Sequence, residues 1–106
     1  MLTIFTPTFN RAHTLPRLYD SLLKQTDHDF EWLIVDDGST DDTPQLVKSF
    51  KTDKFSIRYI KQSNGGKHIA SNVGLKAAKG DIFVVLDSDD WFYPNAVAVS
   101  YTHLRA

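Results

Sequence analysis

The chain has 106 residues, of which 42% are hydrophobic and 24% charged, and its formal net charge at pH 7 is −1. This length suits one small domain with a single core, and the composition is ordinary for a globular protein. The near-zero charge argues against a mainly electrostatic nucleic-acid binder, so no nucleic-acid partner is expected. The sequence contains no cysteine, which excludes disulfides and thiolate metal sites.

No apolar run approaches the roughly 20 residues that span a bilayer, and the start lacks the basic and apolar regions of a signal peptide. A reducing compartment is compatible with the lack of cysteine. We therefore expect a cytoplasmic protein, with the cytoplasmic face of a membrane as an open alternative.

Strand and helix signals alternate along the chain. Short apolar runs rich in β-branched and aromatic residues predict strands over residues 2–6, 30–35, 56–60 and 82–86. Pro7 is expected to stop the first strand. The polar–apolar alternation of the third strand places it nearer a sheet edge, whereas the fourth is apolar throughout, as in a buried parallel strand.

Helices are predicted between these strands. The first has Thr14 as a candidate N-cap, the second has Asp42 or Thr43, and the third covers residues 67–79 with Gly80 as its C′ residue. The expected inward positions are Leu15, Leu18 and Leu22, then Leu46, Val47 and Phe50, then Ile69, Val73 and Ala77 with Ala70 beside them. This order predicts an α/β fold with a mainly parallel, Rossmann-like sheet and helices on both faces.

Polar clusters follow all four predicted strands, at the edge where open α/β sheets bind ligands. They are TPTFNR at 6–11, VDDGSTDD at 35–42, NGGKH at 64–68 and DSDD at 87–90. Asp87 and Asp89 have the Asp-x-Asp spacing that offers hard oxygen ligands to a divalent cation. Asp36 and Asp37 repel each other, and their oxygens could accept hydrogen bonds from a nucleobase or a ribose.

Most of these clusters also have a purely structural interpretation. The first suits a turn with a helix cap, and Asp41 or Asp42 suits the positive end of a helix dipole. Gly65 and Gly66 allow backbone N–H groups to approach an anion, and Lys67 adds a positive charge there. A flexible turn explains those glycines equally well.

Taken together and in this order, the motifs resemble the amino-terminal half of a family 2 glycosyltransferase with the GT-A fold. The segments that carry the resemblance are TPTFN at 6–10, VDDGSTD at 35–41, NGG at 64–66 and LDSDD at 86–90. The resemblance implies a nucleotide-sugar-binding domain over residues 1–95, and it leaves residues 96–106 as a tail that does not read as its continuation.

The resemblance also implies roles for individual residues. The implied nucleotide-binding residues are Pro7, Thr8, Asn10, Asp36, Asp37, Lys67 and Asp87. Asp37, or its neighbour Asp36, would hold the nucleobase. Asp89, with Asp87, would hold the Mn²⁺ or Mg²⁺ ion that bridges the diphosphate.

The activity implied for the intact protein is inverting transfer of a sugar, in the manner of a hexosyltransferase of polysaccharide biosynthesis. The donor would be a nucleotide-diphosphate sugar, a UDP-sugar as first choice, and the acceptor a saccharide or a lipid-linked molecule. No catalytic base is assigned, because no candidate carboxylate follows Asp90. We therefore expect the chain to be inactive alone and to self-associate through an exposed sheet edge.

Two other functions share some of these features. A non-catalytic module that binds a nucleotide or a nucleotide sugar is the main alternative. A receiver domain is disfavoured, because it needs an acidic pair after its first strand, and here that strand is followed by Thr6, Pro7 and Thr8.

Overall fold

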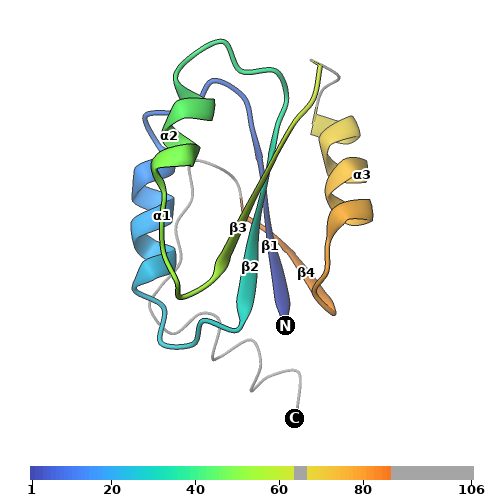
Figure 1. Cartoon of the computed structure of the whole chain (residues 1–106). Helices are drawn as coiled ribbons and strands as arrows, with labels where there is room; N and C mark the ends of the chain where they lie inside the picture. Colours follow the sequence, from blue (N-terminus) through green and yellow to red (C-terminus); the bar gives the residue numbers. More distant parts are fainter. Residues whose placement is uncertain (64–66, 87–106) are drawn as a thin grey trace.

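The computed structural model describes residues 1–63 and 67–86, with the backbone alone for residues 67 and 68. Strands and helices alternate as the sequence predicts (Figure 1). The strands are β1 (Leu2–Thr8), β2 (Phe30–Asp36), β3 (Ser56–Lys61) and β4 (Ile82–Val85). The helices are α1 (Leu15–Leu23), α2 (Thr43–Ser49) and α3 (Lys67–Ala77).

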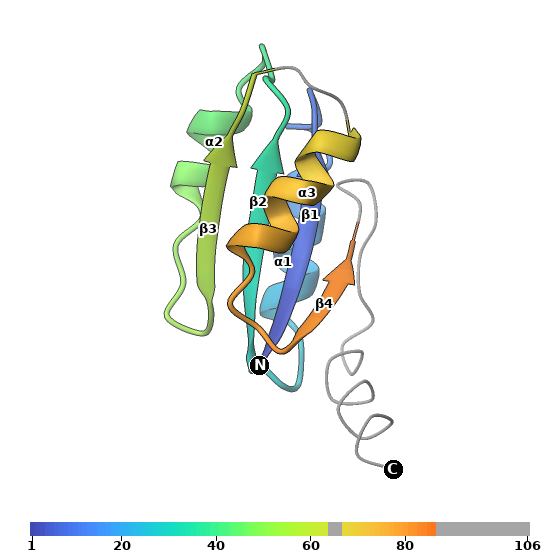
Figure 2. The same cartoon turned by 90° about the vertical axis from the view of Figure 1, so that its right-hand side faces the viewer.

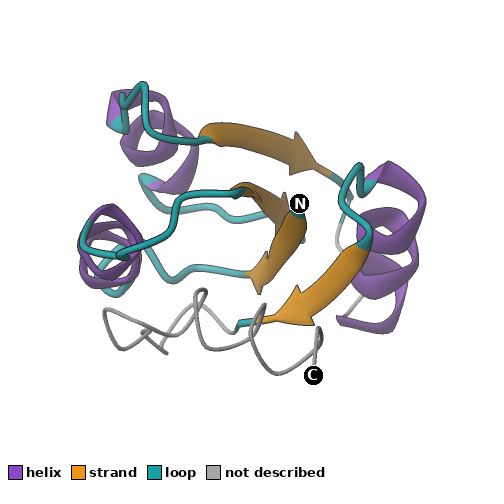
Figure 3. Ribbon diagram, turned by 90° about the horizontal axis from the view of Figure 1, so that it is seen from below, coloured by secondary structure: helices purple, strands orange, loops and turns teal. Residues whose placement is uncertain are grey.

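The strands form one parallel sheet in the order β3-β2-β1-β4. Helices α1 and α2 cover one face of this sheet and α3 covers the other (Figures 1 and 3). Figure 2 shows α3 in front of the sheet, with β3 at one edge. The predicted α/β class, the helices on both faces and the edge position of the third strand are therefore confirmed.

The core has one part on each face of the sheet. The larger part, under α1 and α2, contains Leu2, Ile4, Leu15, Leu18, Leu22, Phe30, Trp32, Ile34 and Val47. The smaller part, under α3, contains Phe5, Leu33, Val35 and Ala70. Because successive residues of a strand face opposite sides, this division assigns a face to each residue near the strand ends.

Pro7 does not stop β1, which continues to Thr8. In a parallel ladder the N–H and C=O of one residue point toward the same neighbouring strand. The Thr8 carbonyl accepts from the Asp37 N–H at 2.9 Å on the β2 side, and the Phe5 carbonyl accepts from the Leu86 N–H at 2.8 Å on the β4 side. Pro7 has the orientation of Phe5, so its missing N–H costs no bond to β2.

The inward face of α3 is predicted correctly except at Ile69, which is 45% exposed. Ala70 is buried, and Val73 and Ala77 pack against the same cluster. The helix comes close to the sheet at Gly74, where a Cβ atom would lie 2.5 Å from the Phe5 ring. This contact, which the apolar pattern did not indicate, selects the face that α3 buries.

Gly80 is not the C′ residue of α3, because the helix ends at Ala77. A Cβ atom on Gly80 would lie 2.6 Å from the Thr3 nitrogen and 2.7 Å from the Met1 carbonyl oxygen. The Gly80 N–H donates to Thr3 Oγ1 at 2.8 Å. Glycine is needed here because the connection to β4 runs directly against the backbone of β1.

The fourth strand is less buried than its apolar sequence predicts. Ile82, Phe83 and Val84 are half-buried, and Val85 is 54% exposed. Within residues 1–63 and 67–86, β4 pairs with β1 alone and lies at the sheet edge. Leu86, which follows the strand, is buried.

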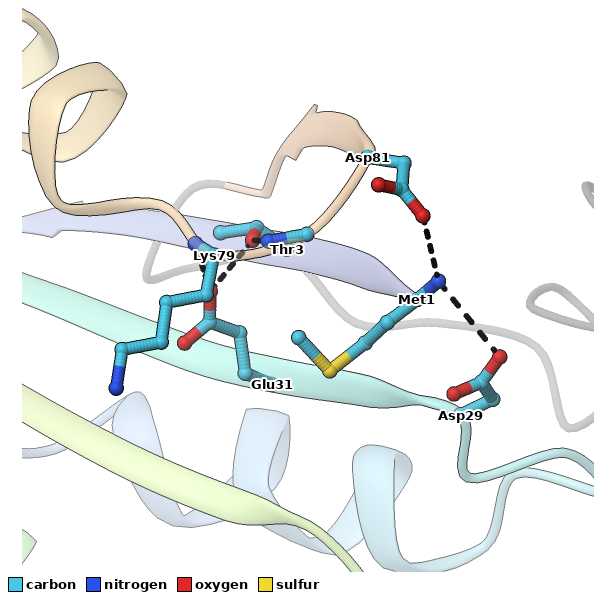
Figure 4. Close-up of polar contacts among 7 residues, drawn as sticks. Met1, Thr3, Asp29, Glu31, Lys79 and Asp81 are labelled. Atoms are coloured by element: carbon cyan, nitrogen blue, oxygen red, sulfur yellow. Dashed lines mark hydrogen bonds and ion pairs between the residues drawn. The ribbon is translucent and has the colours of Figure 1, made fainter.

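A buried carboxylate joins the strands near their amino ends (Figure 4). Glu31 is 2% exposed, and its Oε2 accepts from Thr3 Oγ1 and from the Lys79 N–H, both at 2.6 Å. Arg58 Nη1 donates to Glu31 Oε1 at 3.0 Å and to the Ala77 carbonyl at 2.6 Å. We call these residues, with Gly80, the amino-edge network, since they connect β1, β2 and β3 to the end of α3.

None of the helices in the described part of the chain has the length and apolarity needed to cross a bilayer. Thr14 and Asp42 occupy the N-cap positions of α1 and α2, as predicted, and a proline stands in the first turn of each helix. Neither side chain makes a capping hydrogen bond.

Candidate functional site

The loops that follow β1 and β2 meet at the carboxyl edge of the sheet, where Asn10 connects them. The Asn10 N–H donates to Ser39 Oγ at 2.8 Å, and Asn10 Oδ1 accepts from the Thr40 N–H at 2.8 Å and the Asp41 N–H at 3.3 Å. Asn10 has a φ of 52°, in the left-handed region that asparagine tolerates better than most residues. Asn10 therefore fixes the shape of both loops.

Asp41 strengthens this connection and begins α2. Its Oδ1 accepts from the Thr43 N–H at 3.0 Å and the Thr43 hydroxyl at 2.6 Å, while Oδ2 accepts from the Ala12 N–H at 3.2 Å. Burial raises the pKa of Asp41, but these hydrogen bonds from Thr43 and Ala12 outweigh burial and lower the pKa overall. The structural interpretation of Asp41 is therefore correct.

Asp36 is the most enclosed carboxylate of this edge, with an exposed fraction of 0%. Its Oδ1 accepts from the Ser39 N–H at 2.9 Å, and its Oδ2 accepts from the Tyr59 hydroxyl. Burial, then the hydrogen bond to Asp36 and the charge of Asp36, raise the pKa of Tyr59, so Tyr59 remains a protonated donor. Both oxygens of Asp36 are thus engaged inside the protein.

Asp37 follows the last residue of β2, and its carboxylate contacts Gln62, whereas the Asp36 carboxylate contacts Tyr59, on the opposite face of the sheet. Asp37 is 8% exposed, and its N–H donates to the Thr8 carbonyl at 2.9 Å. Its Oδ1 accepts from Gln62 Nε2 at 2.9 Å. No motif in the sequence identifies Gln62, although its even position places it on the same face as Arg58 of β3.

Two buried polar atoms beside these aspartates have no hydrogen-bond partner in the described part of the chain. They are Thr8 Oγ1 and Gln62 Oε1. Thr8 pairs in register with Asp36, and Gln62 bonds to Asp37, so one such atom lies on each face. Buried polar groups are normally paired, and an exception suggests a missing ligand or water.

The structure brings together five of the residues implied in nucleotide binding, which are Pro7, Thr8, Asn10, Asp36 and Asp37. The Lys67 side chain, both Asp87 and Asp89, and the tail of residues 96–106 lie outside the described residues. Within the part that is described, no group of three or more His, Asp or Glu side chains could hold a metal ion.

The chain is similar to members of a known protein family. The sequence pattern of glycosyl transferase family 2 matches residues 3–106. An uncharacterised glycosyltransferase of Rickettsia felis is 41% identical over 98 residues, which cover 92% of this chain and 16% of that relative.

Solved structures show the same relationship. Residues 1–349 of S. aureus TarS in complex with UDP-GlcNAc have a TM-score of 0.91 at 30% identity, over 98% of this chain and 31% of that TarS chain. PcManGT, a mannosyltransferase of Pyrobaculum calidifontis in complex with GDP-Man and Mn²⁺, has a TM-score of 0.80 at 29% identity, over 86% of this chain and 28% of PcManGT.

The chain thus spans less than a third of each of these proteins. Its parallel sheet with helices on both faces matches the GT-A glycosyltransferase fold. The predicted family and fold are confirmed, and this chain belongs to glycosyl transferase family 2.

Proposed function

We propose that the intact protein transfers a sugar from a nucleotide-diphosphate sugar to an acceptor hydroxyl, and that this chain binds the donor nucleotide. The observation that carries the proposal is the nearly buried Asp37 carboxylate at the carboxyl edge of the sheet, with two buried polar atoms nearby that have no partner among the described residues, Gln62 Oε1 on the same face as Asp37 and Thr8 Oγ1 on the face of Asp36. A nucleoside offers N–H and O–H donors to such acceptors. The complex of TarS with UDP-GlcNAc supports a uridine nucleotide as the first choice.

The two aspartates have different proposed roles. Asp37 contacts the nucleobase, whereas Asp36 supports the loop that carries Asp37, because its oxygens already accept from Ser39 and Tyr59. Pro7, Thr8 and Asn10 line the base pocket. Two further residues are assigned from the sequence, since their side chains lie outside the described part of the chain. Lys67 binds the base or the phosphate, and Asp87 contacts the ribose or the water shell of the metal.

A divalent cation is part of the proposal. The described carboxylates of this edge do not form a metal site, since Asp36 and Asp41 accept hydrogen bonds from the protein with both oxygens. We assign the metal ligands to Asp89 and Asp87, whose Asp-x-Asp spacing offers hard oxygen ligands to a divalent cation. Mn²⁺ or Mg²⁺, when bound, neutralises the charge that develops on the leaving diphosphate. The Mn²⁺ in PcManGT supports this choice of ion.

The remaining features of the reaction are proposed from the family. Transfer inverts the sugar configuration, and the acceptor is a saccharide or a lipid-linked molecule. Deprotonation of the acceptor requires a general base, which we assign to sequence beyond these 106 residues. The cytoplasmic location and the self-association of the fragment remain predictions.

A calorimetric titration of UDP in the presence of Mn²⁺ tests the nucleotide site. We expect Asp37→Ala to weaken binding of both uridine and UDP by about tenfold or more, since a lost hydrogen bond to a charged acceptor is worth about 1.5–3 kcal/mol. Asp89→Ala should weaken binding of UDP but not of uridine, and UDP affinity should no longer depend on Mn²⁺. The exposed Asp53 offers a matched control as Asp53→Ala.

Three results would contradict parts of the proposal. Equal UDP affinity with Mn²⁺ and with a chelator excludes the metal site, and unchanged uridine binding in Asp37→Ala excludes the base contact. Sugar transfer by the 106-residue chain, with several turnovers on an acceptor panel, would show that the catalytic base lies within it.

A further inference from the structure

Strand β3 and the residue that follows it each send one side chain to an aspartate, and the two side chains come from opposite faces of the sheet. The Tyr59 hydroxyl donates to Asp36 Oδ2, and Gln62 Nε2 donates to Asp37 Oδ1 at 2.9 Å. Tyr59 belongs to the face under α1 and α2, where it packs against the larger core. Gln62 shares its parity with Ile60, which packs in the cluster under α3.

On the first face, the contact of Tyr59 extends through Asp36 to the loops. Asp36 accepts from the Ser39 N–H at 2.9 Å, and Ser39 Oγ accepts from the Asn10 N–H at 2.8 Å. Gly38, which precedes Ser39, has a φ of 82°, so the turn at this point is sharp. A single hydroxyl on β3 thus supports the carboxylate that holds this turn in place.

On the second face, the backbone and the side chain of Gln62 are both held. The Gln62 N–H donates to the Asp36 carbonyl at 2.8 Å, which extends the ladder between β2 and β3. The side-chain amide must direct Nε2 toward the Asp37 carboxylate, because a carboxylate accepts and cannot donate when ionised. Gln62 Oε1 is consequently held as a buried acceptor beside Asp37, without a partner in the described part of the chain.

We propose that Tyr59 and Gln62 are positioning residues of the nucleoside-binding half of the site. Tyr59 acts through Asp36 and the turn at Ser39, and Gln62 acts through Asp37. The inference rests on the proposed function. It adds that residues 56–62, which carry none of the family motifs quoted above, contribute to the affinity for the nucleoside and leave binding of the diphosphate unaffected.

The test measures three ligands separately by calorimetry: uridine, UDP with Mn²⁺, and inorganic pyrophosphate with Mn²⁺. Tyr59→Phe removes one hydroxyl, and Gln62→Met removes the amide at similar size. We expect either change to weaken binding of uridine and UDP by about fivefold to tenfold, which is less than the loss of a direct hydrogen bond to a charged group, because each residue acts through an aspartate. Pyrophosphate binding should be unchanged.

Gln62→Glu sharpens the test. It keeps the size of the side chain and an oxygen acceptor, but it replaces the donor facing Asp37 with a second carboxylate. A positioning role predicts a larger loss of uridine binding for Gln62→Glu than for Gln62→Met. A packing role predicts the reverse, since glutamate fills the space of glutamine more closely than methionine does.

Matched controls exist elsewhere in the chain. The Tyr19 hydroxyl also donates one hydrogen bond, to the Lys51 carbonyl at 3.0 Å, but on α1 and away from the aspartates. Tyr19→Phe therefore removes the same chemical group as Tyr59→Phe. Gln45 is exposed on α2, so Gln45→Met is the control for Gln62→Met.

The outcomes distinguish this inference from the proposed function. If the wild type binds uridine and UDP, and the Tyr59 and Gln62 variants bind them as well as their controls do, the positioning role is wrong. The proposed nucleotide site is then unaffected. An equal loss of uridine and pyrophosphate binding also overturns it, because the damage is then general. A wild type that binds neither uridine nor UDP overturns both proposals.

Discussion

Carboxylates are buried at both the amino and the carboxyl ends of the strands, but the polar groups around them differ in how completely they are hydrogen-bonded. At the amino edge, Glu31 receives donors from Thr3, Arg58 and the Lys79 backbone. At the carboxyl edge, Asp36 and Asp37 are also bonded, yet the neighbouring Thr8 Oγ1 and Gln62 Oε1 are buried without partners in the described part of the chain. At the amino edge, the Glu31 carboxylate is hydrogen-bonded by neighbouring residues. At the carboxyl edge, two buried oxygen atoms of the described residues can still form hydrogen bonds with a further molecule.

The difference separates stability from binding within one small sheet. A buried polar group without a partner costs about 1–3 kcal/mol, so a fold retains such groups where something else completes them. The amino-edge network has no comparable unpaired atom among its described side chains. Substitutions at the amino edge should therefore lower the free energy of unfolding, and substitutions at the carboxyl edge should lower nucleotide affinity.

Glu31→Ala should have the largest effect. It leaves the Arg58 guanidinium, the Thr3 hydroxyl and the Lys79 N–H without their shared acceptor, and removal of one partner from a buried charged pair costs about 3–5 kcal/mol. Urea denaturation measures the loss. Uridine affinity of the fraction that remains folded should be unchanged.

Asp81→Asn is the control for Glu31→Ala. The Asp81 carboxylate lies at the same edge and pairs with the Met1 amino group at 3.4 Å, but its side chain is almost fully exposed (Figure 4). Exposed ion pairs are worth at most about 1 kcal/mol. If Glu31→Ala costs no more than Asp81→Asn, the amino-edge network does not stabilise the fold.

Two buried threonines on β1 offer the sharpest comparison of the edges. Thr3→Val removes a hydroxyl that donates to Glu31 and accepts from the Gly80 N–H, so we expect a loss of about 2–3 kcal/mol. Thr8→Val removes a buried hydroxyl that has no partner among the described residues, and it should leave stability unchanged or raise it by up to about 1 kcal/mol.

The two threonine variants should rank in the opposite order when uridine affinity is measured. Thr8→Val is expected to weaken uridine binding, because the Thr8 hydroxyl is then no longer present to form a hydrogen bond with the nucleoside. Thr3→Val should not change uridine affinity. Urea denaturation and calorimetry on both variants decide the matter. Equal stability losses at the two positions would remove the distinction between the edges.

Gly80→Ala should have a smaller effect on stability. Its Cβ would meet backbone atoms of Thr3 and Met1 at 2.6 and 2.7 Å, so the connection before β4 must shift. Overpacking of this kind costs about 1–3 kcal/mol. Asn72→Ala, at an exposed position of α3, is the control. A melting temperature equal to that of the control would show that the connection can move freely.

The periodic features of the sequence predicted the fold well. Apolar runs gave all four strands, and the stripe of Leu15, Leu18 and Leu22 gave the buried face of α1. The polar clusters after β1 and β2 were expected at one edge of the sheet, because parallel strands end together, and the loops meet there through Asn10, Ser39 and Asp36.

Other features depend on contacts between distant segments, which a single sequence does not show. Pro7 continues β1 because of the direction its nitrogen faces, and Gly80 is needed where the chain crosses β1 rather than at a helix end. Tyr59 and Gln62 reach the aspartates across the strand pairing of β2 with β3. The alternation of faces along β3 and into the residue that follows it is the signal that could have identified them.

Acid should act on stability through the amino edge. Burial raises the pKa of Glu31, but hydrogen bonds from Thr3 and the Lys79 backbone, and the hydrogen bond and charge of Arg58, outweigh burial and hold the pKa below its usual value of 4.5. The unfolded chain therefore binds the proton first as pH falls. The contribution of Glu31 to stability is complete above pH 4.5 and is lost as pH falls through the lower folded value.

The measurement is the free energy of unfolding in urea between about pH 6 and about pH 3, in the wild type and in Glu31→Gln. The variant starts lower and should fall less steeply with acid, since it has no carboxylate to protonate at this position. Asp20→Asn, which breaks an exposed pair with Lys24, should keep the wild-type slope. Parallel curves for wild type and Glu31→Gln would mean that acid destabilises the fold elsewhere, with Asp41 at the carboxyl edge as the next carboxylate to test, because its pKa is also lowered.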